Sequence, residues 1–83
     1  MRARYFAWVR ERVGKAEEEI EAPSGVATVG DLIGWLAARD EGYAAAFSEP
    51  RAIRVALDQE HVEHDAPLMG AREIAFFPPM TGG

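Results

Sequence analysis

The residues of this sequence that could do chemistry lie at its end, in the segment Pro78-Pro79-Met80-Thr81-Gly82-Gly83. Proline donates no backbone hydrogen bond, so the proline pair would end a preceding strand and lead the chain away as a stiff, extended spacer. The five residues after Pro78 could carry the terminal carboxylate about 15–17 Å, far enough to enter another protein's active site. We therefore predict a flexible tail over residues 80–83 on a folded domain over residues 1–79.

The Gly82-Gly83 pair indicates that the reactive group is the carboxylate of Gly83. Glycine has the narrowest cross-section of any residue and leaves the carboxylate open to attack. A carboxylate with a pKa of about 3.5 is ionised at neutral pH and is a poor electrophile, so it must be activated, most simply as a mixed anhydride with AMP. Gly25 and Gly30 are not followed by Lys-Ser/Thr and form no phosphate-binding loop. We predict that no cofactor is bound and that an activating partner uses ATP.

The composition argues against several other classes of function. The 83 residues include no cysteine, which excludes disulfides and thiol nucleophiles. The net charge of −5, with no run of Lys and Arg, argues against nucleic acid as a partner. His61 and His64 lack an evident third ligand, so we predict no metal site. No apolar stretch approaches the roughly 20 residues of a membrane span, and the N-terminus has no long uncharged export segment. We expect no membrane partner and a cytoplasmic location.

Period-two alternation and charge predict a hairpin in the first part of the chain. A strand is expected over residues 2–8, with Ala3 and Tyr5 on one face. A turn containing Gly14 should follow, and then a short, charged edge strand over residues 17–22. We interpret its run of three glutamates as a solvated edge.

A helix is the clearest element of the middle region. Thr28 and Asp31 form the acidic variant of a capping box, which predicts a helix that begins there and ends near Asp40, with Gly42 after it. One apolar stripe follows the helical period and should face the core: Val29, Leu32, Ile33 and Leu36.

Further strands are predicted over residues 53–58 and 73–77, with shorter elements over 43–47 and 61–65. Ile53, Val55 and Leu57 should face the core. The order of a hairpin, a crossing helix and further strands predicts an α+β fold with a mixed sheet and one main helix packed on one face. The β-grasp of ubiquitin-like proteins is the architecture that fits this order.

Strand alternation also predicts a surface for a partner protein. Ile74 and Phe76 should face the core, while Phe77 should face outward on the same side as Phe6. Because the first and last strands of a β-grasp sheet are neighbours, we expect these two phenylalanines at the root of the tail, inside a charged rim. The predicted partner-binding residues are Arg4, Phe6, Arg54, His61, Phe77, Pro78, Pro79, Met80 and Thr81.

Four segments resemble the small, sulfur-carrying subunit of molybdopterin synthase, a ubiquitin-like family: RYFAWVRERVG, TVGDLIGWL, IRVALDQEHV and AFFPPMTGG. The FFPP-x-x-GG ending is the specific part. The resemblance implies that a ubiquitin-activating-like adenylyltransferase converts Gly83 to an acyl-adenylate and that sulfur from a donor system replaces the AMP. The thiocarboxylate would then donate sulfur in the large subunit's active site, building the dithiolene of molybdopterin. The chain would have no self-contained active site.

Two other readings stay open at this point. In the first, the carboxylate is activated in the same way but serves another pathway: thiamine thiazole synthesis, tRNA thiolation or protein modification. The other is a β-grasp interaction module whose tail is never activated.

Overall fold

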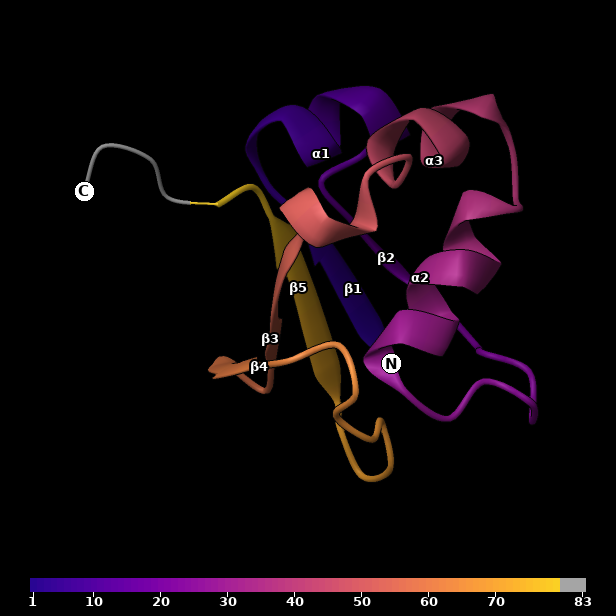
Figure 1. The fold of residues 1–83 in the computed structure, drawn as a ribbon, viewed down its shortest axis with the longest axis vertical. Helices are drawn as coiled ribbons and strands as arrows, with labels where there is room; N and C mark the ends of the chain where they lie inside the picture. Colours follow the sequence, from indigo (N-terminus) through magenta and orange to yellow (C-terminus); the bar gives the residue numbers. More distant parts are fainter. Residues whose placement is uncertain (80–83) are drawn as a thin grey trace.

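The computed structural model describes residues 1–79, which fold into one mixed sheet with helices on one side (Figure 1). The elements, in chain order, are β1 (Arg2–Tyr5), α1 (Ala7–Val13), β2 (Glu17–Glu19), α2 (Val29–Ala37), α3 (Glu41–Ala46), the short 3-10 helix η1 (Pro50–Ala52), β3 (Arg54–Leu57), β4 (Glu60–Val62) and β5 (Glu73–Phe77).

The five strands lie in the order β2-β1-β5-β3-β4. The central strands β1 and β5 are parallel, whereas β1–β2, β3–β4 and β3–β5 are antiparallel. Helices α2 and α3 connect the edge strand β2 to β3 in the other half of the sheet, and the first and last strands pair side by side between them. The predicted α+β class and the β-grasp architecture are confirmed.

The core lies between the sheet and its helices. Tyr5 stacks on Phe76 with ring centroids 5.8 Å apart, and Phe47 packs its edge against Phe76 at 5.1 Å. The predicted inward residues of the strands, Ala3, Tyr5, Ile53, Val55, Ile74 and Phe76, are all buried, and Leu57 is partly buried against them. Period-two alternation therefore predicted the correct face of the central strands.

The segment after β1 corrects the predicted hairpin. It is helix α1, not a strand to Trp8 followed by a turn. Ala7 has a φ of +52°, which turns the chain out of the strand direction. Val9 and Val13, one helical turn apart, are buried, and Gly14 ends the helix at a φ of 93°. Buried residues one turn apart and a glycine at the end are ordinary signs of a helix. In an element of only seven residues they are weaker than the period-two alternation of the preceding strand, which is why the sequence predicted a strand here.

Helix α2 begins as predicted and ends earlier. The Thr28 hydroxyl accepts from the Asp31 N–H at 3.1 Å, and Asp31 accepts in return from the Thr28 N–H at 3.2 Å. The backbone N–H of Ala27 donates to the same Asp31 carboxylate. This hydrogen bond, and to a smaller extent the one from Thr28, lowers the pKa of the Asp31 carboxyl. All four residues of the predicted stripe are buried. Helix α2 ends at Ala37, and Asp40 caps the next helix instead, accepting from the Tyr43 N–H at 3.1 Å.

Gly42 does not terminate a helix but lies inside α3, where it permits close packing. A Cβ at this position would lie 2.8 Å from the Arg12 carbonyl oxygen. Only glycine lets α3 approach the end of α1 this closely.

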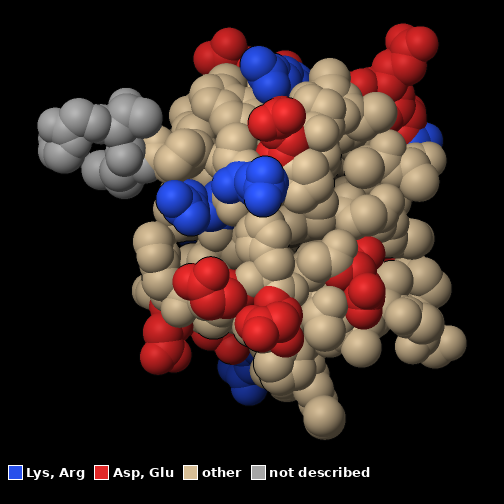
Figure 2. All heavy atoms as spheres, in the orientation of Figure 1, with Lys and Arg blue, Asp and Glu red and all other residues tan. Residues whose placement is uncertain are grey.

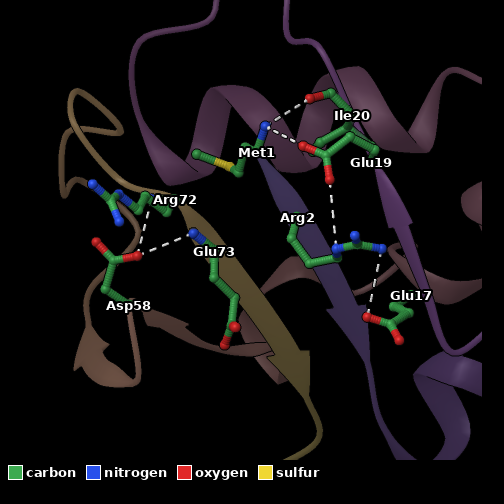
Figure 3. Close-up of polar contacts among 8 residues, drawn as sticks. All are labelled: Met1, Arg2, Glu17, Glu19, Ile20, Asp58, Arg72 and Glu73. Atoms are coloured by element: carbon green, nitrogen blue, oxygen red, sulfur yellow. Dashed lines mark hydrogen bonds and ion pairs between the residues drawn. The ribbon is translucent and has the colours of Figure 1, made fainter.

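The turn between β3 and β4 also holds the start of β5. Asp58 and Gln59 both have positive φ, 49° and 70°, the pattern of a two-residue type I′ hairpin turn. The Asp58 carboxylate accepts from the backbone N–H groups of Arg72, at 2.9 Å, and Glu73, at 3.0 Å (Figure 3). The side chain of one turn thereby fixes where β5 enters the sheet.

The three glutamates of β2 do not share one environment. Glu17 and Glu19 lie on the open face, which is the face of the sheet that the helices do not cover. Both contact Arg2 there, at 3.6 and 3.4 Å (Figure 3). Glu18 points to the other side, and only 13% of its side chain is exposed. The solvated-edge interpretation is confirmed for the outer two and is wrong for Glu18.

Glu18 is the acceptor at the centre of a polar cluster. Its Oε2 accepts from the hydroxyls of Tyr43, at 2.6 Å, and Tyr5, at 2.8 Å, and from Arg39 at 3.4 Å. Lys15 contacts its other oxygen at 3.5 Å. Burial alone would raise the pKa of Glu18, but the two tyrosine hydrogen bonds and the charges of Arg39 and Lys15 outweigh it and lower that pKa. Burial and the Glu18 carboxylate raise the pKa of both tyrosines.

We expect Glu18→Gln to reduce the acid sensitivity of the fold. Because the folded pKa of Glu18 lies below its usual value of 4.5, its ionised form stabilises the fold above that pH, and the contribution is lost as the pH falls through the folded pKa. The difference in unfolding free energy between the native protein and Glu18→Gln, measured by urea titration, should therefore shrink as the pH is lowered below 4.5.

Glu17→Gln is the matched control, because that side chain is 53% exposed on the open face. The difference in unfolding free energy between Glu17→Gln and the native protein should change less over the same pH range. An equal change in both variants would show that the cluster around Glu18 does not set the acid response.

Candidate functional site

The candidate site is the end of the sheet where β5 stops. The strand ends at Phe77, and Pro78 and Pro79 follow it, half-buried and outside the ladder, as predicted. In Figure 1 this end of β5 points away from α2. The predicted reactive residues Gly82 and Gly83, together with Met80 and Thr81, lie outside the described residues.

One group of predicted residues surrounds Phe77. Phe77 is half-buried, and its ring lies 5.2 Å from the imidazole of His61 on β4. Arg54 pairs with Phe77 across β3 and β5 and is exposed. These three predicted residues, from three strands, therefore form one cluster of an aromatic ring, an imidazole and a cation.

A second group surrounds Phe6. Phe6 is 42% exposed, and its backbone N–H donates to the Phe76 carbonyl at 3.1 Å. The Arg4 guanidinium lies 5.6 Å from the centre of the Phe6 ring, and 3.9 Å from the Glu73 carboxylate. Phe6 reaches this position from the corner between β1 and α1, not from within a strand as predicted.

Small residues separate the two groups. Arg4 pairs with Ala75, Ala75 with Ala56, and Ala56 with His61, so the four side chains form one row across the open face. Both alanines are only 8% exposed although they are on this face, because larger residues flank them. The arrangement is a shallow apolar floor edged by aromatic and charged side chains, which is how a protein-binding surface is usually composed.

A hollow of about 560 Å³ adjoins the Phe77 group. Its polar groups come from Arg51, Arg54, His61, Glu63 and His64, and its apolar part from Ile53, Val55 and Val62. In Figure 2, Lys and Arg side chains gather over η1 and the start of β3, beside the point where the described chain ends. Acidic side chains gather lower on the same face. Arg51 and Arg54 therefore bring positive charge to the end of β5, although Glu63 lines the same hollow.

Sequence reasoning placed His61 among the partner-binding residues but could not see this hollow. His64, in contrast, has a structural contact, because its Nε2 lies 2.9 Å from the Ile53 carbonyl oxygen. Arg51 was missed altogether, since it belongs to η1, which no periodic pattern marks.

A second hollow, of about 520 Å³, lies at the other end of β1. Apolar side chains dominate its lining, among them Met1, Ile20, Leu68 and the 91% exposed Met69. It lies at the opposite end of the sheet from Pro78, and Met1 and Glu21 are its titratable residues.

The described residues contain no group of three His, Cys, Asp or Glu side chains placed to hold a metal ion. None of the helices within residues 1–79 is long and apolar enough to span a bilayer.

Comparisons with known proteins agree with this architecture. A family model described as the ThiS family matches residues 3–83. The chain is 39% identical to the molybdopterin synthase sulfur carrier subunit of Escherichia coli, over 95% of this chain and 94% of that protein. It is 32% identical to the Haemophilus influenzae protein of the same name, over the same shares. Among solved structures, SAMP1 from Haloferax volcanii matches with a TM-score of 0.71 and 26% identity, covering 100% of this chain and 98% of that one.

Proposed function

The chain belongs to the ThiS family, and on this basis we propose that it is a sulfur carrier that serves molybdopterin synthesis. The observation that carries the proposal is the full-length similarity to two sulfur carrier subunits of molybdopterin synthase. The end of β5 supports it, because the strand stops at Phe77 beside an exposed face and only five residues separate Phe77 from Gly83.

The proposed chemistry takes place on the Gly83 carboxylate within partner active sites. A carboxylate oxygen attacks the α-phosphorus of ATP on a ubiquitin-activating-like adenylyltransferase, and pyrophosphate leaves. A sulfur nucleophile from a donor system then attacks the acyl carbon and AMP leaves, which gives a thiocarboxylate. In the large subunit of the synthase, two thiocarboxylated carriers in turn each transfer one sulfur to a pterin precursor, which forms the dithiolene, and water restores each Gly83 carboxylate.

No catalytic group is needed on the carrier, because activation and transfer occur on its partners. Pro78 and Pro79 leave the sheet beside the open face defined by Phe6, Phe77, Arg4, Arg54 and His61, which we propose as the docking surface for the large subunit. The positive charge that Arg51 and Arg54 bring to the end of β5 would favour an acidic entrance on the partner.

Intact mass spectrometry tests the proposal directly. The full chain is incubated with ATP, an adenylyltransferase of this type and a sulfur donor, and Gly83 should exchange one oxygen for sulfur. A second incubation with the large subunit and the pterin precursor should return the carrier to its original mass. A carrier that never gains sulfur would be a β-grasp interaction module. A carrier that gains sulfur but serves only thiazole or tRNA thiolation, or is joined to proteins, would have a different client.

Removal of Gly83 should abolish sulfur transfer and leave the fold intact. Gly83 lies beyond the described domain and supplies the reactive carboxylate. The thermal midpoint of the truncated chain should match that of the full chain within error, while the oxygen-to-sulfur exchange should disappear. Sulfur transfer by the truncated chain would show that Gly83 is not the carrier group.

Gly82→Ala should slow activation or transfer far more than it changes stability. An added methyl group would meet the walls of a narrow partner channel or restrict the backbone angles that entry requires. Turnover with both partners, measured beside the thermal midpoint, checks this. Native turnover would mean that the channel has no constriction at this residue.

Phe77→Ala should weaken binding to the large subunit at least about tenfold, because aromatic residues at the centre of an interface often contribute about 2 kcal/mol or more. Calorimetric titration provides the dissociation constant, and urea titration checks that the variant still unfolds cooperatively.

Met69→Ala is the control for this experiment, since Met69 is the most exposed large apolar residue described and lies at the far end of the sheet. It should bind as the native chain does. Equal dissociation constants for the native chain, Phe77→Ala and Met69→Ala would show that the large subunit does not dock on the open face.

A further inference from the structure

The hollow of about 560 Å³ contains two arginines that no carboxylate of the described chain engages. Arg2, Arg4 and Arg39 each form an ion pair with a glutamate. Arg51 and Arg54 are exposed and form no ion pair within residues 1–79, although the chain has 14 acidic side chains against 9 basic ones. Their guanidinium N–H groups are therefore open to an anion from solution.

The walls of this hollow are held by the fold itself. Arg51 belongs to η1, and Arg54 begins β3 three residues later. Between them, the Ile53 carbonyl oxygen lies 2.9 Å from His64 Nε2, and because a carbonyl only accepts, Nε2 donates to it. The His64 carbonyl in turn accepts from the Gly30 N–H at 2.8 Å. The start of β3, the segment after β4 and the start of α2 are thereby tied together around the hollow.

The charges of the lining fit a phosphate group. With the imidazoles of His61 and His64 neutral, the two arginines outweigh Glu63, which pairs with neither of them within residues 1–79. A phosphate monoester carries about 1.5 to 2 negative charges at pH 7, so it can use both arginines, whereas a single carboxylate needs only one. The planar guanidinium also presents its N–H groups in pairs that match phosphate oxygens.

We propose that the hollow binds a phosphate group, and that a bound phosphate and the large subunit exclude each other. The first part concerns this chain alone. The second part rests on the proposed function, because Arg54 also belongs to the docking surface. One guanidinium cannot meet a bound phosphate and an acidic group of the partner at the same time.

NMR titration of the full, isotopically labelled chain tests the first part. Inorganic phosphate, AMP and adenosine are added separately at about pH 7.5, with the ionic strength held constant by sodium chloride. Phosphate and AMP should shift the backbone amide signals of residues 51–54 and 61–64 along saturating curves. The dissociation constants should be millimolar, as expected for ion pairs at an exposed surface. Adenosine, which lacks the phosphate, should not bind, and the ratio of the AMP and phosphate constants shows whether a free or a nucleoside-bound phosphate is preferred.

Arginine variants locate the site. Arg51→Gln and Arg54→Gln should each weaken phosphate binding about three- to fivefold. Arg72→Gln is the matched control, because it removes the same charge just before the opposite end of β5, where Arg72 forms no ion pair within residues 1–79. It should bind phosphate as the native chain does.

Two results of the native titration would overturn the proposal without any variant. Shifts that rise in a straight line, or that are as large around Arg72 as around Arg51, would show a general response to ions. Adenosine binding as tight as AMP binding would show that the hollow does not recognise the phosphate.

Calorimetric titration with the large subunit tests the second part. In phosphate at several times its dissociation constant, the native carrier should bind the large subunit several-fold more weakly than in chloride of equal ionic strength. Arg51 lies outside the docking surface, and Arg51→Gln should lose most of this difference, which excludes an effect of phosphate on the large subunit itself. Equal affinities of the native carrier in both salts would overturn the exclusion. Failure to bind in either salt would contradict the proposed function instead, while the NMR titration would still decide the first part.

Discussion

The parallel pairing of β1 with β5 is the constraint on which the rest of the structure depends. These strands come from opposite ends of the chain, and their register sets Ala3 against Ile74 and Tyr5 against Phe76 in the middle of the sheet. Buried apolar contact of this kind is the main source of stability for a small domain. Because β5 is central, it is paired with β1 as far as Phe76 and with β3 as far as Phe77, and the residues that follow begin from a fixed point.

The fixed end of β5 also determines which side chains lie together on the open face of the sheet. With β5 between β1 and β3, the side chains that alternate away from the core form one surface that ends at the root of the tail. Phe77 meets His61 there, and Phe6 joins from the corner after β1. Under the proposed function, a partner that docks on this surface would meet the end of β5 at a defined position, so recognition of the fold would also direct Gly83 to the partner.

The same alternation gives β2 two different roles. Glu17 and Glu19 share Arg2 on the open face, while Glu18 faces the helices and gathers two tyrosines, Arg39 and Lys15. A carboxylate that is largely removed from water is costly unless it is hydrogen-bonded. Here its four donors satisfy it and link β2 to α3. The edge strand of the sheet is therefore fastened by polar contacts, and one of these contacts involves the only lysine of the chain.

The sequence by itself determined the α+β class, the core faces of the central strands, helix α2 with its capping box, and the end of β5 at Phe77. Each depends on local chemistry or on a short repeat, which can be read without knowing what lies opposite. Tertiary structure alone decided the rest. Helix α1 depends on Ala7 turning the chain at a positive φ, Gly42 on the close approach of α3 to α1, and the state of Glu18 on tyrosines from two other elements. These features arise from residues distant in sequence, so no local pattern carries them.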